Sequence, residues 1–196
     1  MERSAQVSRK TSETDITARL VLESLEESRI QSGVPFLDHM LSAVAKHGRM
    51  HIDLVCAGDT EIDDHHSVED IGIVLGQAFQ KAIGDKAGIV RFGSSIIPMD
   101  DALTMTAVDI SGRPFFEYTG MGLNGYIGKY SEELTCEFFR SFVLNAGINL
   151  HVNVLHGKNR HHVHESIFKS VAVSLYRAMV FDDFLQGKIL STKGTI

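Results

Sequence analysis

The chain carries the same short histidine and glutamate pattern twice, and this repetition limits its possible folds more than any other feature. Residues 65–69 read His-His-Ser-Val-Glu, and residues 161–165 read His-His-Val-His-Glu. Only ten histidines occur in 196 residues, and four of them form these leading His-His pairs. Imidazole and carboxylate groups without a nearby thiolate are ligands that Mn, Fe, Zn and Co accept. The repeat therefore predicts metal chemistry carried by a duplicated unit.

The segments that precede the two motifs also match. Apolar residues recur at helical spacing over residues 37–48 and again over residues 138–147. Gly48 and Gly147 end these stretches, and each is a plausible residue just beyond a helix C-terminus. Each predicted helix is followed by an alternating strand pattern, at residues 51–55 and 150–154.

The segments that follow the motifs match as well. Asp63 and Asn159 each stand two residues before a His-His pair, where we expect them to cap the next helix.

Each half also contains strand patterns before its first helix. These lie at residues 16–23 in the first half and at 103–110 and 115–119 in the second. The two following helices carry apolar stripes, Val68, Ile71, Val74, Leu75 and Phe79 in one and Ile167, Val171, Leu175 and Met179 in the other.

These patterns predict an α+β fold made of two pseudosymmetric halves, each with sheets packed against helices. We place the first repeat at residues 1–92 and the second at residues 93–196. A chain of 196 residues with 43% apolar content is long enough to bury a real core.

Helical geometry decides how the repeated motif can bind metal. His65 and Glu69 are four residues apart and share one helix face, whereas His66 is turned about 100° away from His65. One motif therefore cannot easily complete a metal shell alone, but two units could each supply histidines to a pair of shared metals. The alternative is that the His-His pairs are solvated helix caps without a ligand role.

His39 lies on the helix before the first motif, and its counterpart in the second half is Glu137. Each is a candidate for the remote ligand of one metal site. A lone histidine on an apolar helix is otherwise a half-buried structural residue. The remaining histidines have no such counterpart and are interpreted as structural or surface residues, namely His47, His51, His151, His156 and His164.

Composition restricts the partners and the compartment. A formal charge of −6 and a pI near 5.9 argue against a nucleic-acid partner, which would select for a basic face. Cys56 and Cys136 are isolated, which favours a reducing compartment, and we expect the cytoplasm. Neither a signal-peptide core near the start nor 18 consecutive apolar residues occur, so we expect no membrane partner.

Several motifs together resemble one known family. They are FLDHM at 36–40, DDHHSVED at 63–70, PMDDAL at 98–103, SGRPFF at 111–116, GKNRHHVHESIFKS at 157–170 and STKG at 191–194. In this order and at these spacings they resemble imidazoleglycerol-phosphate dehydratase, from Glu13 to the C-terminus. The resemblance implies a hydro-lyase of histidine biosynthesis that uses two Mn²⁺ ions per active site and converts imidazole glycerol phosphate to imidazole acetol phosphate. It also implies a duplicated fold of the ribosomal protein S5 domain 2-like type and a homo-oligomer of 24 subunits with active sites at subunit interfaces.

The resemblance also implies roles for individual residues. Glu137 departs from the pattern, since many members have histidine there, although a carboxylate is a competent Mn ligand. Leu190 likewise replaces the proline that often precedes STKG. The implied proton-transfer groups are Glu13 and Glu165. The implied metal ligands are His39, His65, His66, Glu69, Glu137, His161, His162 and Glu165. The implied substrate and phosphate contacts are Glu13, His39, His65, Glu69, Arg91, Arg113, His161, Lys169, Ser191 and Lys193, the last two in a C-terminal substrate-binding tail.

Two other functions use the same residues differently. A hydrolase would use paired metals to activate water against a phosphoester or an amide, and release of inorganic phosphate would support it. A metal-storage or structural-metal protein would bind ions through the repeated motifs, while Arg113, Lys169 and Lys193 would be surface charges only. Turnover of a phosphorylated imidazole diol separates the dehydratase from both.

Overall fold

A computed structural model describes residues 2–194. The first half contains β1 (Ser4–Lys10), β2 (Thr14–Leu22), β3 (Arg29–Gln31), α1 (Pro35–Gly48), β4 (Met50–Gly58) and α2 (His65–Ile83). Its strands form one sheet in the order β1-β2-β4-β3, with β3 parallel to β4 and the other pairs antiparallel.

The second half repeats this arrangement. It contains β5 (Phe92–Met99), β6 (Ala102–Asp109), β7 (Phe115–Thr119), α3 (Glu133–Ala146), β10 (Asn149–His156) and α4 (Arg160–Met179). The sheet order is β5-β6-β10-β7, again with one parallel pair, β7 with β10. A small hairpin, β8 (Tyr126–Ile127) with β9 (Tyr130–Ser131), precedes α3, and the 3-10 helix η1 (Asp183–Leu185) follows α4.

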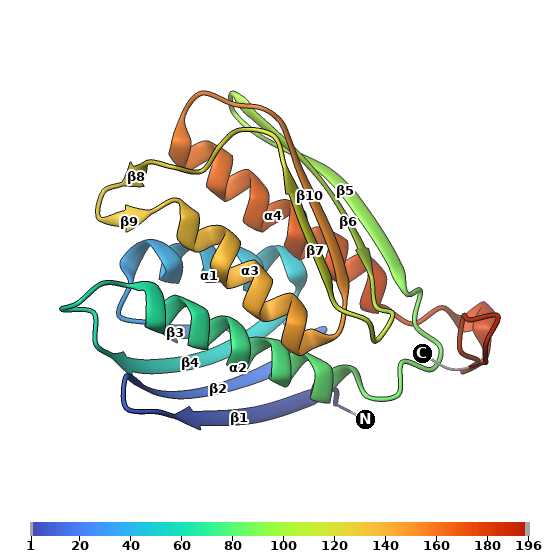
Figure 1. Ribbon diagram of the computed structural model, residues 1–196. Coiled ribbons are helices and arrows are strands. Elements are labelled where there is room, and N and C mark those ends of the chain that lie inside the picture. Colours follow the sequence, from blue (N-terminus) through green and yellow to red (C-terminus); the bar gives the residue numbers. More distant parts are fainter. Residues whose placement is uncertain (1, 195–196) are drawn as a thin grey trace.

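The long helices lie between the two sheets (Figure 1). Helix α2 packs on β1 and β2, and α4 packs on β5 and β6. The two halves meet through two helix pairs, each with one helix from either half: α2 contacts α3, and α1 contacts α4. The predicted α+β fold with duplicated halves is therefore confirmed, and each motif helix faces a helix from the other half.

One continuous apolar core joins both halves. The predicted stripes of α2 and α4 are buried, including Ile71 and Phe79 in the first half and Ile167 and Leu175 in the second. On β2 the inward residues alternate with exposed ones, which is the two-residue period of a half-buried strand. The burial of this shared core holds the N-terminal ends of α2 and α4, and hence the two His-His pairs, in fixed places.

The predicted helix ends were partly wrong. Gly147 follows α3 in the left-handed conformation as expected. Gly48 is instead the last residue of α1, and Arg49 adopts the left-handed conformation after it. A Cβ on Gly48 would lie 2.5 Å from the Met50 side chain and 3.7 Å from Ala172 of α4, so glycine there allows close packing.

The two capping predictions also had different outcomes. Asn159 is the N-cap of α4, and its side chain accepts a hydrogen bond from the backbone N–H of His162. Asp64, rather than Asp63, occupies the N-cap of α2. Asp63 still satisfies one free helical donor, because its carboxylate accepts the His65 N–H at 2.8 Å.

Candidate metal centres and active site

The compact donor cluster contains His39 from α1 with His161 and Glu165 from α4. Within residues 2–194 it is the one group of three or more potential metal ligands whose donor atoms all lie within 4.8 Å of one another. Glu165 Oε2 lies 3.8 Å from His39 Nε2 and 3.3 Å from His161 Nε2. The cluster joins the first half to the second, as the pseudosymmetric interpretation requires.

Lys169 holds the other oxygen of the Glu165 carboxylate. Its Nζ donates to Glu165 Oε1 at 2.6 Å, one helical turn further along α4. Burial acts to raise the pKa of Glu165, but the hydrogen bond and charge of Lys169, with smaller effects of His39 and His161, lower the pKa overall. The carboxylate is therefore ionised with Oε2 left facing the two imidazoles, which is the form that binds a metal ion.

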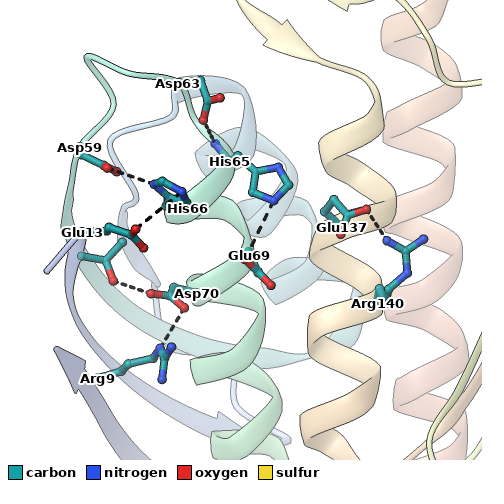
Figure 2. Close-up of polar contacts among 11 residues, drawn as sticks. Arg9, Glu13, Asp59, Asp63, His65, His66, Glu69, Asp70, Glu137 and Arg140 are labelled. Carbon is teal, nitrogen blue, oxygen red and sulfur yellow. Dashed lines mark hydrogen bonds and ion pairs between the residues drawn. The ribbon is translucent and has the colours of Figure 1, made fainter. Parts of the chain in front are cut away.

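The corresponding cluster of the first half is looser. His65 Nε2 and Glu69 Oε2 are 3.9 Å apart on α2, and Glu137 lies across from them on α3 (Figure 2). The Glu137 carboxylate forms an ion pair with Arg140, one turn along its own helix. His65, Glu69 and Glu137 thus lie in the same region, but among the described residues their donor atoms do not form a group within 4.8 Å.

The second histidine of each pair faces elsewhere, as helical geometry predicts. His66 Nδ1 donates to Asp59 Oδ2 at 3.0 Å, and His162 Nδ1 donates to Asp101 Oδ1 at 2.6 Å. Glu13 Oε1 is 3.9 Å from His66 Nε2 (Figure 2). In both cases a carboxylate fixes the ring orientation through Nδ1 and leaves Nε2 as the free ligand atom, a common arrangement around metal-binding histidines.

The charges of these aspartates agree with that role. The hydrogen bond from His66 to Asp59 raises the pKa of His66, with a smaller opposing effect of desolvation. The pKa of Asp101 is well below its usual range because its carboxylate accepts bonds from the backbone N–H of Asn159, the His162 ring and the backbone N–H of Lys158. Asp59 and Asp101 were not predicted as site residues. Asp101 stands in the quoted PMDDAL motif, but nothing in the local sequence of Asp59 signals a histidine partner.

A separate cavity of about 620 Å³ collects the predicted phosphate contacts. Arg113 and Lys193 line it as exposed side chains, and in the part of the chain that the structure describes neither forms an ion pair. Arg91 also lines it but is already engaged, since Nε and Nη2 donate to Asp109 at 2.7 and 3.2 Å. The full lining is Arg91, Phe92, Ser111, Arg113, Ile189, Leu190, Ser191, Thr192 and Lys193.

The engaged arginine shapes the cavity. Arg91 Nη1 donates to the backbone oxygen of Leu190 at 2.6 Å, which fixes the C-terminal segment next to Ser191 and Lys193. The guanidinium also lies 4.7 Å from the ring centre of Phe92. Arg91 thus has a structural role here, while Arg113 and Lys193 remain available to an anion.

One chain does not bring all predicted site residues together. The cation-lined cavity lies beside the C-terminal end of α4, because the Arg91 backbone N–H donates to Ala178 O at 2.8 Å. His161 stands at the other end of this helix, and at 1.5 Å per residue the two ends are about 25 Å apart. Lys169 lies between them, bonded to Glu165 rather than to the cavity.

The histidines without a predicted ligand role are placed as follows. His164 is fully buried, with Nδ1 2.7 Å from Thr135 Oγ1 and Nε2 3.7 Å from Glu132 Oε1. Burial lowers the pKa of His164 to about 4. His51 is also buried, whereas His47, His151 and His156 are exposed.

The fold and these sites define a candidate metal-dependent enzyme for a small anionic substrate. The family model for imidazoleglycerol-phosphate dehydratase matches residues 32–175. Dehydratases of this name from Ralstonia nicotianae and Alkaliphilus metalliredigens are 47% and 46% identical to the chain, with 100% of both sequences covered in each case. The chain therefore belongs to the imidazoleglycerol-phosphate dehydratase family, and the expected hydro-lyase class is confirmed.

Solved structures agree with this assignment. A crystal structure of imidazoleglycerol-phosphate dehydratase from Staphylococcus aureus has a TM-score of 0.83 and 36% identity, covering 91% of this chain and 99% of that one. The enzyme from Pyrococcus furiosus, in complex with (S)-C348, has a TM-score of 0.82 and 31% identity over 97% and 100% of the two chains. Within residues 2–194, no helix is both long enough and apolar enough to span a membrane.

Proposed function

We propose that this chain dehydrates imidazole glycerol phosphate to imidazole acetol phosphate in the cytoplasmic synthesis of histidine, with two Mn²⁺ ions per active site. The observation that carries the proposal is the cluster of His39, His161 and Glu165, built from both halves of a chain that belongs to the dehydratase family. Two imidazoles and one carboxylate fit Mn²⁺ by donor type and leave coordination positions for further ligands.

Each ion would have its own set of donors. His39, His161 and Glu165 would hold one, and His65, Glu69 and Glu137 would hold the other, with His66 and His162 as ligands from outside these sets. The bound ions would supply Lewis-acid activation and a template for the substrate ring. Lys169 binds one oxygen of the Glu165 carboxylate, and the other oxygen faces the imidazole of His161.

The cation-lined cavity would bind the substrate phosphate. Arg113 and Lys193 are exposed donors without carboxylate partners among the described residues, and Ser191 adds a hydroxyl. Charge-assisted contacts of this kind hold phosphate strongly and direct the rest of the substrate. Arg91 supports them by fixing the C-terminal segment through Leu190.

The two candidate proton-transfer residues differ in their surroundings. Glu165 is ionised, mostly buried and bonded to Lys169, so its geometry suits a ligand. Glu13 is exposed, and its carboxylate has no hydrogen bond within residues 2–194, although it lies 3.9 Å from His66 Nε2. We therefore assign Glu13 to remove or return the proton next to the ring, and Glu165 to metal binding.

The active site would form between subunits. The cavity and the compact cluster of one chain are about 25 Å apart along α4, too far for one small substrate to reach both. The outward Nε2 atoms of His66 and His162 also face away from their own clusters. Exposed Ile96 and Met105, directly opposite each other on the outer face of β5 and β6, supply an apolar surface for such contacts. The family resemblance implies 24 subunits.

Product formation tests this function. Purified protein with Mn²⁺ and imidazole glycerol phosphate should generate the keto product, followed by its ultraviolet absorbance, and chelator-treated protein should not. Release of inorganic phosphate instead would indicate the hydrolase. Bound metal with neither product would indicate storage, and would contradict the proposal.

A further inference from the structure

Asp70 is a buried carboxylate next to the ligand Glu69, but its side chain faces a different part of the molecule. It accepts a hydrogen bond from Arg9 Nε at 2.8 Å (Figure 2). It accepts another from Thr14 Oγ1 at 2.6 Å. Asp70 and Thr14 are 7% and 3% exposed, so both oxygens of Asp70 are used in an environment largely without water. Charge-assisted bonds in such surroundings are strong and hold their partners in one geometry.

The two partners of Asp70 stand on either side of Glu13. Arg9 lies near the end of β1 and Thr14 begins β2, so Asp70 joins both strands of this hairpin to α2. Within the turn, Thr11 Oγ1 accepts the backbone N–H groups of Glu13 and Thr14. The whole turn is therefore held relative to the helix that carries His66.

The Glu13 side chain depends on this support. The Glu13 backbone oxygen accepts the Asp59 N–H at 3.2 Å, and Asp59 in turn orients His66. The carboxylate of Glu13 has no hydrogen bond among the described residues, and its recorded contact is His66 Nε2 at 3.9 Å. Its position is thus set by its backbone, which is fixed through Asp70 and Asp59.

In the second half, the corresponding turn is held to its helix without a buried charged side chain. Ser166 occupies the place that corresponds to Asp70, and Ala102, which begins β6, corresponds to Thr14. Ser166 instead meets Thr104, two residues further along β6, with their hydroxyl oxygens 2.6 Å apart. The functional carboxylate of that turn, Asp101, is held directly by the backbone N–H groups of Lys158 and Asn159. Among the described residues, the buried carboxylate anchor therefore belongs to the half whose turn carries Glu13, a carboxylate without hydrogen bonds of its own.

We propose that Asp70 is a positioning residue for Glu13, acting through Thr14 and Arg9 to hold the β1–β2 turn at the active site. The proposal rests on the assignment of Glu13 to proton transfer under the proposed function. Since a displacement of about 1 Å can cost about a hundredfold in rate, a loosened turn should lower kcat much more than it changes substrate binding.

The test compares isosteric variants of the metal-loaded enzyme. Asp70→Asn and Thr14→Val should each lower kcat at least about tenfold, with KM and metal content within about twofold of wild type. Thr106→Val is the matched control, because Thr106 is equally buried on β6 and donates to Ser170 O at 2.9 Å, away from both turns. It should lose similar stability while keeping kcat.

A double-mutant cycle shows whether Asp70 acts through Glu13. In a Glu13→Gln background, adding Asp70→Asn should cause almost no further loss, because residues that act through one another are not additive. Full additivity of the two losses, or an unchanged kcat in Asp70→Asn, would overturn the proposal.

A readout without turnover separates this proposal from the proposed function. The Thr11 and Thr14 backbone amides bond within the turn, so they should exchange hydrogen faster in Asp70→Asn than in wild type. If Asp70→Asn exchanges faster but the wild-type enzyme lacks dehydratase activity, the proposed function is refuted and the anchoring is kept. Unchanged exchange with normal wild-type turnover would refute the anchoring alone.

Discussion

The two halves of this chain share a topology and a motif but build different candidate metal-binding regions from them. In both, the first histidine and the glutamate of the motif face a helix of the opposite half. In the second half His161 and Glu165 meet His39, and Lys169 fixes the glutamate. In the first half the facing residue is Glu137, which Arg140 engages (Figure 2). Duplication sets the backbone, while single side chains decide how ready each cluster is to bind an ion.

The opposite end of the molecule shows a sharper difference. At the start of β5, Arg91 pairs with Asp109 beside exposed Arg113 and Lys193. At the start of β1, Arg3 pairs with Glu23, and the cavity there contains Glu2 instead of free cations. Among the described residues, the second half therefore has the candidate anion site, and the matching cavity of the first half lacks unpaired cations.

The largest expected effect comes from removing the motif glutamates. Glu165→Gln and Glu69→Gln should each lose roughly one metal equivalent per subunit, because ligand charge sets affinity. Activity should fall at least about hundredfold in both, as even outer-sphere changes cost 10- to 100-fold. Elemental analysis measures the metal, with Glu27→Gln as an exposed control. Full occupancy in both variants would return the motifs to the role of solvated caps.

The anion site is the next difference to test. Arg113→Ala and Lys193→Ala should each raise KM about ten- to a hundredfold, since one charge-assisted contact contributes about 1.5–3 kcal/mol and 1.4 kcal/mol is one decade. Metal content should stay normal. Phosphate should also inhibit both variants less strongly. Unchanged KM and undiminished phosphate inhibition would make these residues surface charges.

Acid stability should distinguish the halves because His164 corresponds to Val68, and both are fully buried. Burial lowers the pKa of His164 from 6.5 to about 4. The unfolded chain therefore binds the proton first, and stability is lost as pH falls from about 6.5 to about 4, by roughly 3 kcal/mol, with none lost at pH 7. Thermal melts of metal-free protein check this. The melting temperature of wild type should fall between pH 7 and acid more than that of His164→Val, which lacks the titrating group. The same pH dependence of melting temperature in both proteins would contradict this role of His164 in acid stability.

The smallest effect concerns Arg140. Its guanidinium must leave Glu137 before that carboxylate can bind a metal, and a partly exposed pair of this kind contributes about 0.2–1 kcal/mol. Arg140→Gln should therefore tighten the weaker class of Mn²⁺ site about two- to fivefold, whereas Arg140→Lys should change it little. Calorimetric titration of metal-free protein checks this. If the two Mn²⁺ sites of wild type bind with equal affinity, the expected difference between the two halves does not exist.

Periodicity predicted the parts of the structure that depend on burial. The helices, β4 and β10 were predicted because their apolar residues repeat at regular spacing. The strands β1 and β5 were missed, since they pair at sheet edges and their sequences SAQVSRK and FGSSIIPM lack a clear alternation. Asp59 reaches His66 only through tertiary packing of the loop after β4, and no local pattern records such a contact.

The central claim is that one active site takes its metal cluster and its phosphate cavity from different subunits. Mixing Glu165→Gln protein with Lys193→Ala protein after reversible dissociation tests it directly. Each variant alone should be nearly inactive at low substrate concentration, whereas the mixed oligomer should regain activity well above both, because some sites then combine an intact cluster with an intact cavity. No recovery in demonstrated mixed oligomers would place both parts of the site on one chain and contradict the account.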